Sequence, residues 1–98
     1  MNINIKSIHF TADSKLETLL QDRISKLSKY HDSILGADVF LKIEKNNQDE
    51  NKITEIKLNI PGTELFAKKQ SNSFEKSADS TIEALRKQLK KHKEKQRQ

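Results

Sequence analysis

Hydrophobic and polar residues alternate along four short stretches of the chain, and this period of two predicts half-buried strands. The four stretches are residues 2–8, 38–45, 53–60 and 64–69. Because alternate side chains of a strand point to opposite faces, the apolar positions that are in phase should line one face of a sheet. They are Ile3, Ile5, Val39, Leu41, Ile43, Ile56, Leu58, Ile60, Leu65 and Ala67.

Two further segments carry apolar residues at spacings of three and four, which predicts amphipathic helices. The first follows Asp13, a residue suited to the N-cap, and should run to about Tyr30. The second covers residues 74–98. Their apolar stripes are Leu16, Leu19, Leu20, Ile24, Leu27 and Tyr30 in the first helix, and Phe74, Ala78, Ile82, Leu85 and Leu89 in the second.

Turn-forming residues separate these elements. The first helix should break around Asp32-Ser33, and Gly36 favours a turn before the second strand. The polar residues 46–52 predict a loop, and Pro61-Gly62 predicts a turn between the third and fourth strands.

The order of elements is therefore β-α-β-β-β-α, which predicts an α+β fold. Strands and helices that are apolar on one side are best buried in a two-layer sandwich, a four-stranded sheet with both helices on one face. The first crossover should be right-handed and parallel, and the other strand pairs antiparallel. The second face of the sheet is then open to solvent, and residues 1–98 form a single domain.

Composition narrows the class of protein. The chain has 98 residues, of which 33% are hydrophobic and 34% charged, and it has no cysteine. The lack of cysteine excludes a disulfide scaffold, a thiolate nucleophile and a cysteine-bound zinc. No apolar run is long enough to span a membrane, and the N-terminus has no secretory signal pattern, so we expect a cytoplasmic protein without a membrane partner.

Positive charge is concentrated at the C-terminal end. Residues 86–98 contain seven basic side chains and one acid, a net charge of +6, while the whole chain carries +5. A nearly neutral body with a cationic helix is typical of a protein that binds a polyanion, most often a phosphate backbone. The alternatives are a solvated helix end, or a basic amphipathic helix that docks on a calmodulin-like protein or a membrane surface. Docking on a calmodulin-like protein or on a membrane requires an apolar stripe that does not already cover the sheet.

Arg23 is unusual because it falls inside the apolar stripe of the first helix, between Leu27 and Tyr30. One interpretation is an arginine whose stem covers the core while its guanidinium reaches solvent. The other is that Arg23, with Lys26 and Lys29, faces a phosphate-rich partner. The two interpretations are compatible.

The face of the sheet opposite the helices carries Phe40 and Phe66, surrounded by lysines. Such a surface can bind single-stranded RNA by stacking. We favour the simpler interpretation, in which the two rings form a cross-strand pair that stabilises the sheet. The lysines are Lys6, Lys42, Lys57 and Lys68.

No residue set suggests catalysis or a cofactor. His9, His31 and His92 are dispersed without a second ligand at metal-binding spacing, and His92 should pack on the apolar stripe. Asp79 and Glu83 lie early in the last helix, where carboxylates favour its positive dipole end. We therefore predict no enzyme activity, no metal, no cofactor and no small-molecule substrate.

Three segments together resemble a known family. They are residues 39–45 (VFLKIEK), residues 16–30 with RISKLSKY at their end, and residues 85–93 (LRKQLKKHK). With the opening Met-x-Ile-x-Ile and the order of elements, they resemble the short form of hibernation promoting factor and ribosome-associated inhibitor A. The resemblance covers nearly the whole chain, and its specificity comes from the order and spacing of the motifs.

The resemblance implies a fold similar to double-stranded-RNA-binding domains. It also implies binding to 16S-type rRNA of the small ribosomal subunit, in the channel for tRNA and mRNA, where the protein would silence idle ribosomes. Long members of the family have a second, dimerising domain, and we expect none in this chain. Ser73 and Lys69 depart from the family pattern, which we interpret as local capping and surface changes. The family's basic positions fall on Arg23, Lys26, Lys42, Arg86, Lys87, Lys90, Lys91 and Lys93, to which the charge pattern adds Lys29.

Two alternative functions stay open at this point. The chain could bind structured RNA away from the ribosome, or it could be an adaptor whose basic helix docks on an acidic protein.

Overall fold

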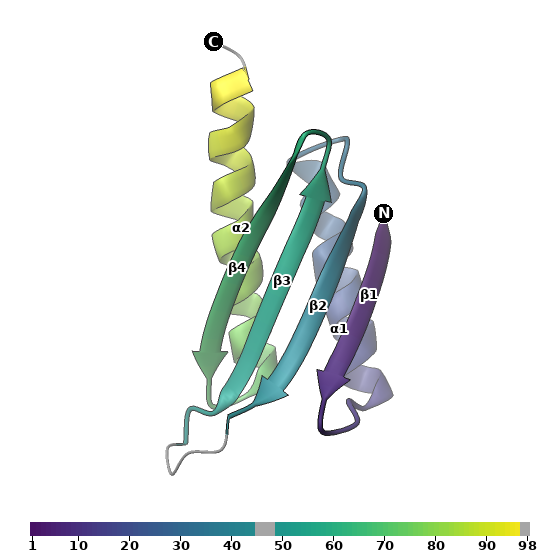
Figure 1. Ribbon diagram of the computed structural model, residues 1–98, viewed down its shortest axis with the longest axis vertical. Helices are drawn as coiled ribbons and strands as arrows, with labels where there is room; N and C mark the ends of the chain where they lie inside the picture. Colours follow the sequence, from purple (N-terminus) through teal and green to yellow (C-terminus); the bar gives the residue numbers. More distant parts are fainter. Residues whose placement is uncertain (45–48, 97–98) are drawn as a thin grey trace.

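The computed structural model describes residues 1–44 and 49–96, with side chains in the last helix described up to Lys93. The predicted order β-α-β-β-β-α is confirmed (Figure 1). The elements are β1 (Asn2–Ile8), α1 (Ser14–Ser25), a 3₁₀ turn (Lys26–Lys29), β2 (Gly36–Ile43), β3 (Lys52–Ile60), β4 (Thr63–Ser71) and α2 (Phe74–Gln96).

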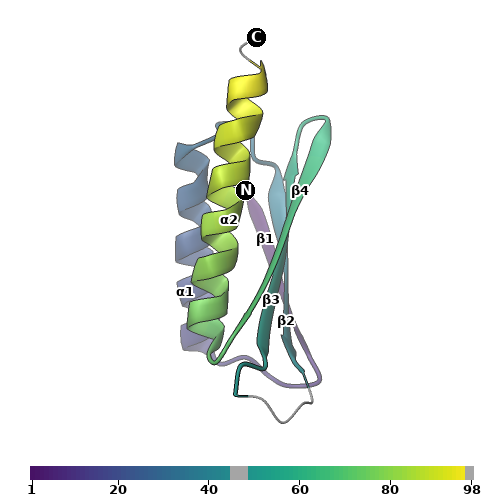
Figure 2. The ribbon, with the colours of Figure 1, turned by 90° about the vertical axis from the view of Figure 1, so that its left-hand side faces the viewer.

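The sheet has the strand order β1-β2-β3-β4. As predicted, β1 and β2 are parallel, whereas β2 with β3 and β3 with β4 are antiparallel. Both helices lie on the same face of the sheet (Figure 2), which confirms the two-layer architecture. No helix in the described part of the chain is long and apolar enough to cross a membrane.

The first helix is shorter in α-helical form than predicted. It begins after Asp13, whose side chain accepts a hydrogen bond from the backbone N–H of Leu16 at 2.8 Å, the expected N-cap. It tightens into a 3₁₀ turn after Ser25. The hydroxyls of Ser25 and Ser28 both donate to backbone carbonyls three residues earlier, and such side-chain bonds compete with regular helix hydrogen bonds.

Strand ends also differ from the prediction. Gly36 is the first residue of β2 and not part of a turn, and a Cβ at this position would lie 2.8 Å from the backbone oxygen of Asn2. Glycine is thus needed where β1 approaches β2 closely. β2 ends at Ile43, two residues before the predicted end of this strand. Lys45 and the first part of the predicted loop belong to residues 45–48, which lie outside the described residues. Residues 97–98 of the predicted last helix also lie outside them.

The last two strands are longer than predicted and are joined by the predicted turn. β4 spans Thr63–Ser71, and the pair Ile60 and Thr63 closes a two-residue turn of Pro61 and Gly62. Gly62 has a φ of 82°, which favours glycine. At the start of α2, the backbone N–H of Lys76 donates to the Ser73 hydroxyl at 3.1 Å, which confirms the capping role inferred for this serine.

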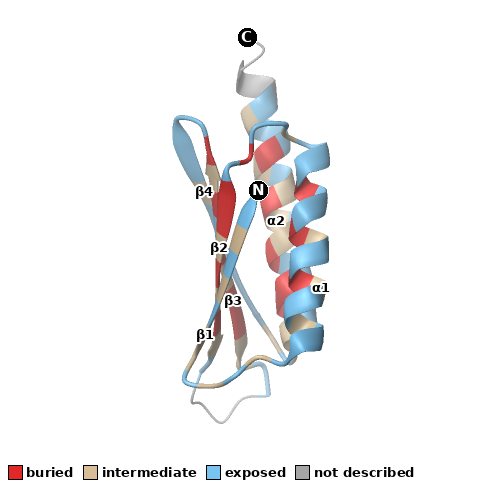
Figure 3. Cartoon of the chain, turned by 90° about the vertical axis from the view of Figure 1, so that its right-hand side faces the viewer, coloured by how far each residue is buried: buried red, intermediate tan, exposed pale blue. Residues whose placement is uncertain are grey.

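The core lies between the sheet and the two helices (Figure 3). In the register, Ile5 is level with Val39, Val39 with Ile56, and Ile56 with Ala67, so one apolar row crosses all four strands. The helices close this row with buried Leu20, Ile24, Leu27, Ala78, Leu85 and Leu89. Burial of these side chains is the main stabilising term of the fold.

One residue of the predicted sheet face is not in the core. Ile43 is 43% exposed, because it is the last residue of β2 and pairs with Lys52 at the very start of β3. Ile43 therefore lies on the predicted face but outside the core, since alternation fixes the face of a side chain but not whether a helix covers it.

Three buried hydroxyl groups join β3 to α2. The Thr54 and Ser77 hydroxyl oxygens lie 2.7 Å apart, and Ser77 donates to the Phe74 carbonyl at 3.2 Å. The hydroxyl of Thr81 lies 3.1 Å from the Thr54 carbonyl and 2.7 Å from the Ser77 carbonyl. Since the Ser77 proton has a carbonyl partner, Thr54 is the donor to Ser77.

We expect Ser77→Ala to lower the free energy of unfolding by about 1–3 kcal/mol, because it leaves the buried Thr54 hydroxyl without an acceptor. The double variant Ser77→Ala/Thr54→Val should regain part of this loss, since both polar partners are then gone. Urea denaturation of the single and double variants measures the difference. A double variant less stable than the sum of the two single changes would contradict this account.

Candidate nucleic-acid interface

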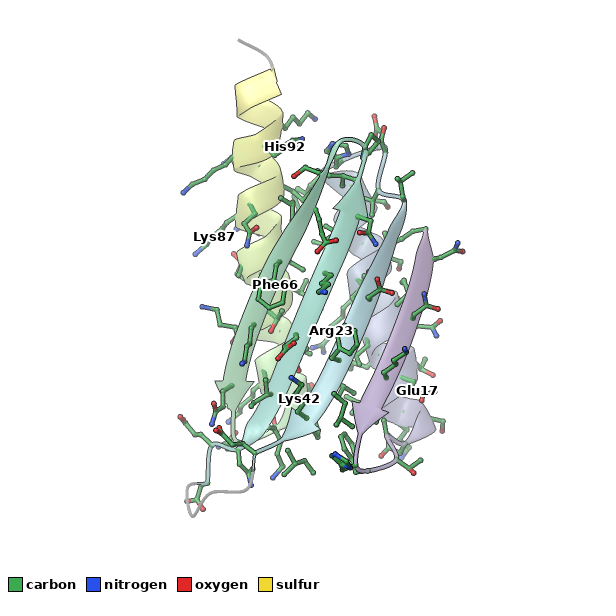
Figure 4. The ribbon with its side chains drawn as sticks, viewed as in Figure 1. Glu17, Arg23, Lys42, Phe66, Lys87 and His92 are labelled. Atoms are coloured by element: carbon green, nitrogen blue, oxygen red, sulfur yellow. The ribbon has the colours of Figure 1, made fainter. Side chains whose placement is uncertain are left out.

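The C-terminal half of α2 carries a row of exposed lysines on the side turned away from the core. Leu85 and Leu89 are completely buried, while Lys87, Lys90, Lys91 and Lys93 are exposed. None of these lysines forms an ion pair with a carboxylate among the side chains that the structure describes. Figure 1 shows that the end of α2 extends beyond the sheet, and Figure 4 shows Lys87 beside the sheet with its side chain pointing away from it.

Arg86 differs from these lysines because its charge is already paired. Its Nε and one terminal nitrogen donate to the two carboxylate oxygens of Glu83 at 2.9 and 2.5 Å. Its guanidinium also lies over the Tyr30 ring, 5.8 Å from the ring centre. The Glu83 carboxylate raises the pKa of Arg86, and Arg86 in turn lowers the pKa of Glu83.

Arg23 forms ion pairs across the two helices. It donates to the Asp79 carboxylate, and another of its nitrogens lies 3.5 Å from the Glu75 carboxylate. The hydrogen bond to Asp79 is the largest cause of the raised pKa of Arg23. The side chain is 30% exposed, so its head reaches the rim of the core as one interpretation expected, but its partners are carboxylates of this chain.

The roles predicted for Asp79 and Glu83 at the positive dipole end of α2 were therefore incomplete. Glu75 is the acid in the first turn of α2, whereas Asp79 and Glu83 lie further along and contact arginines. Both arginines are held in place by acids that come from α2.

A groove of about 340 Å³ runs between the two helices. Its walls combine apolar, aromatic, acidic and basic side chains. They are Arg23, Lys26, Leu27, Tyr30, Asp79, Ile82, Glu83 and Arg86. The Nζ of Lys26, in the 3₁₀ turn, lies 3.3 Å from Oδ2 of Asp22 in α1, and exposed pairs of this kind contribute little to stability.

Lys42 lies on the opposite face of the sheet from the other predicted basic residues. Figure 4 shows it with Phe66 on the face turned toward the viewer, while Arg23 lies behind the sheet. The Nζ of Lys42 donates to the Glu55 carboxylate at 2.9 Å, and the Nζ of Lys68 lies 3.6 Å from the same carboxylate oxygen. The structure thus brings together the basic residues of α1 and α2 but not Lys42.

The predicted cross-strand pair of Phe40 and Phe66 is wrong. Phe40 lies opposite Glu55, and Phe66 opposite Lys57, because β3 separates the strands that carry the two rings. Phe66 is 46% exposed. The sequence gives the face of each aromatic residue, but the pairing depends on strand order.

Two of the dispersed histidines meet at the end of the helical layer. The ring centres of His31 and His92 are 5.8 Å apart, and the Nδ1 of His31 accepts a hydrogen bond from the backbone N–H of Ser33 at 3.1 Å. The Nε2 of His92 is buried without a hydrogen-bond partner among the described residues.

Lys69, which departs from the family pattern, lies on the helix side of β4, because it pairs with Thr54. It borders a second hollow along α2, with Asp79, Ser80, Glu83, Ala84 and Lys87. Two acids in this hollow offset its two lysines, so it is less cationic than the exposed row on α2.

The comparison with known proteins identifies the family. Residues 3–97 match the family described as sigma 54 modulation protein / S30EA ribosomal protein. The chain belongs to this family. It is 31% identical over 96 residues to the ribosome hibernation promoting factor of Pseudomonas putida, covering 98% of this chain and 90% of that protein. The resemblance found in the sequence motifs is thereby confirmed.

Solved structures agree with this assignment at the level of the fold. A ribosomal subunit interface protein from Coxiella burnetii superposes with a TM-score of 0.86 at 22% identity, covering 95% of this chain and 98% of that one. The N-terminal domain of Protein Y from Thermus thermophilus gives a TM-score of 0.82 at 19% identity, covering 94% and 99%.

The groove is not predicted by the sequence pattern. Periodicity places Tyr30 in the apolar stripe of the first helix and does not connect the acids of α2 to α1. The spacing contains a signal, since Arg23 and Tyr30 are seven residues apart and so are Asp79 and Arg86, which places each pair on one side of its helical segment. What was missing was the relative placement of the two helices.

Glu55 makes the stability of the sheet depend on pH. The hydrogen bond from Lys42 is the main cause of its lowered pKa, and Lys68 adds to it. A lowered pKa in the folded state stabilises the protein at pH values above 4.5, the ordinary pKa of this carboxyl group, and this contribution is lost as pH falls through the folded pKa.

We expect the melting temperature of Glu55→Gln to fall less steeply with pH below about pH 5 than that of the wild type. The melting temperature of Lys42→Met should also fall less steeply, because the main cause of the lowered pKa is removed. Thermal unfolding followed by circular dichroism from about pH 6 to about pH 3 measures the slopes. Wild-type slopes in both variants would contradict the prediction.

Proposed function

We propose that the protein is a ribosome hibernation factor that binds the small ribosomal subunit in the tRNA and mRNA channel and inhibits translation in idle ribosomes of the cytoplasm. The match to the family over residues 3–97 supports the ribosome as partner, as does the similarity to proteins named ribosome hibernation promoting factor. The observation that carries the proposal is the row of exposed lysines on α2, which is what a helix facing rRNA phosphates needs.

The mechanism is occlusion and needs no chemical step. Phosphate contacts supply affinity but do not read sequence, so specificity comes from the fit of the protein to folded RNA. The protein measures 47 by 24 by 18 Å, and its narrow, elongated shape suits a channel. A protein lodged there blocks tRNA and mRNA by excluded volume.

The ion pairs divide the proposed rRNA-binding residues into two groups. Arg23, Lys26, Lys42 and Arg86 each have a carboxylate partner within the chain, so each contributes less to phosphate affinity than its formal charge suggests. The main phosphate contacts are then made by Lys29, Lys87, Lys90, Lys91 and Lys93.

The burial pattern argues against docking of the basic helix on a calmodulin-like protein. A basic helix that docks on another protein uses its apolar stripe as the anchor. Here Ala78, Leu85 and Leu89 are completely buried under the sheet, so this stripe is not available without unfolding.

We expect the purified protein to reduce the output of a cell-free translation reaction when its concentration approaches that of the ribosomes. Sedimentation of the same reaction through a sucrose gradient should place the protein with the small subunit and the whole ribosome. Full translation at a severalfold excess, with the protein at the top of the gradient, would refute the proposal. Inhibition with the protein at the top of the gradient would favour binding to RNA away from the ribosome.

We expect the triple variant Lys87→Gln/Lys90→Gln/Lys91→Gln to bind ribosomes with a flatter dependence of log affinity on log salt concentration. When a phosphate contact is lost, binding releases fewer counterions from the RNA, and the magnitude of the slope falls by about 0.7–0.9 per contact. The matched control is Lys6→Gln/Lys15→Gln/Lys57→Gln, which removes the same charge from exposed positions outside the α2 row and should keep the slope. Equal slopes in the two triple variants would show that the α2 row is not the contact surface.

A further inference from the structure

The groove between α1 and α2 has a composition that a phosphate site does not have. Asp79 and Glu83 contribute two carboxylates, and the hydrophobic residues Leu27 and Ile82 line its wall. Carboxylates repel phosphate, and both arginines in the groove are already held by these acids. The groove therefore fits a neutral, flat, partly apolar group that can donate hydrogen bonds.

Tyr30 and Arg86 offer a stacking surface for such a group. The Cζ atom of Arg86 lies over the Tyr30 ring, 5.8 Å from its centre, so the two groups form one composite surface, and Tyr30 is 39% exposed. Unpaired bases of RNA stack on aromatic rings and on arginine planes. The two bonds from Arg86 to Glu83 fix the guanidinium, so little side-chain entropy is lost when a base stacks on it.

The acids of the groove provide acceptors for the edge of a base. The hydrogen bond from Arg23 to Asp79 uses Oδ1, and no described contact involves the other oxygen, Oδ2. Among the bases, guanine presents two adjacent donors on its Watson–Crick edge, its ring N–H and its amino group, and the Asp79 carboxylate can accept both, at Oδ2 and at the second lone pair of Oδ1. Lys26 borders the groove and Lys29 ends the same 3₁₀ turn, so both lysines are available to the phosphate of the bound nucleotide.

We propose that the groove between α1 and α2 is a binding site for a single unstacked base of structured RNA, with guanine preferred. The base stacks on the composite surface formed by the Tyr30 ring and the Arg86 guanidinium above it, Asp79 accepts from the edge of the base, and Lys26 binds its phosphate. A volume of about 340 Å³ lies within the range of sites for small ligands. This inference deepens the proposed function and rests on it, because the RNA that supplies the base is the one that the lysine row on α2 binds.

The test uses short RNA duplexes that carry one bulged nucleotide, with guanine, uracil or an abasic ribose at the bulge. Fluorescence anisotropy measures their affinity for the full chain. We expect the guanine bulge to bind at least about fivefold more tightly than the abasic bulge, which is the lower end for stacking of one base on an aromatic side chain. The affinity for the uracil bulge should lie between the affinities for the guanine and abasic bulges.

Variants assign the effect to the groove. Tyr30→Leu and Arg86→Lys should bring the ratio of guanine to abasic affinity close to one, since leucine keeps apolar volume and lysine keeps charge while neither keeps the stacking plane. The matched control is Lys87→Gln, which should weaken both RNAs by the same factor and leave the ratio unchanged. A ratio that is the same in the wild type and in Tyr30→Leu would overturn the inference.

A second measurement uses only the wild-type protein, so it does not require that any variant folds. In NMR spectra of the wild-type protein, guanosine monophosphate should shift the Tyr30 ring signals and the Arg86 Nε–H signal, whereas ribose 5-phosphate should shift only lysine signals. Equal effects of the two compounds would mean that the groove does not recognise a base. If the protein nevertheless inhibits translation and sediments with ribosomes, this inference fails while the proposed function stands. If it does neither, the proposed function fails.

Discussion

The burial of both helices on one face of the sheet is the constraint on which the rest of the structure depends. α2 uses its whole apolar stripe to cover the strands, with Leu85 and Leu89 completely buried. Its basic side must then face outward, and the second face of the sheet must stay open (Figure 2). The same packing places α1 beside α2, and this contact creates the groove. A single apolar layer thus determines where the charge can be presented.

The acidic residues decide what the basic residues are able to do. A count of formal charge treats the arginines and lysines alike, but Asp79 and Glu83 pair with arginines, and Glu55 pairs with Lys42. These ion pairs weaken the attraction of the paired basic residues for phosphate. In return they fix the guanidinium planes, which flexible lysines do not offer. Lys87, Lys90, Lys91 and Lys93 lack such pairs among the described side chains, and they keep their long-range attraction for a polyanion.

The sequence was sufficient to predict the order of elements, the layers and most of the core, because periodicity is a local property. It failed where the answer depends on the relative position of distant segments. Ile43 has the correct phase but lies at the end of the sheet, and Phe40 and Phe66 share a face but are separated by β3. For the same reason the charge pattern found the lysines on α2, yet the partners of Arg23, which lie more than 50 residues away along the chain, could not be inferred.

The parallel pairing of β1 with β2 has a consequence for the order of folding. β2, β3, β4 and α2 are neighbours in sequence as well as in space, so they can assemble through short-range closures. β1 can join only after the chain has passed through α1 and returned, and pairings across such long separations carry a larger entropic cost. The β1–α1 unit is therefore the segment expected to dock last and to open first. Because α1 provides one wall of the groove, that wall is completed only at the final step of folding.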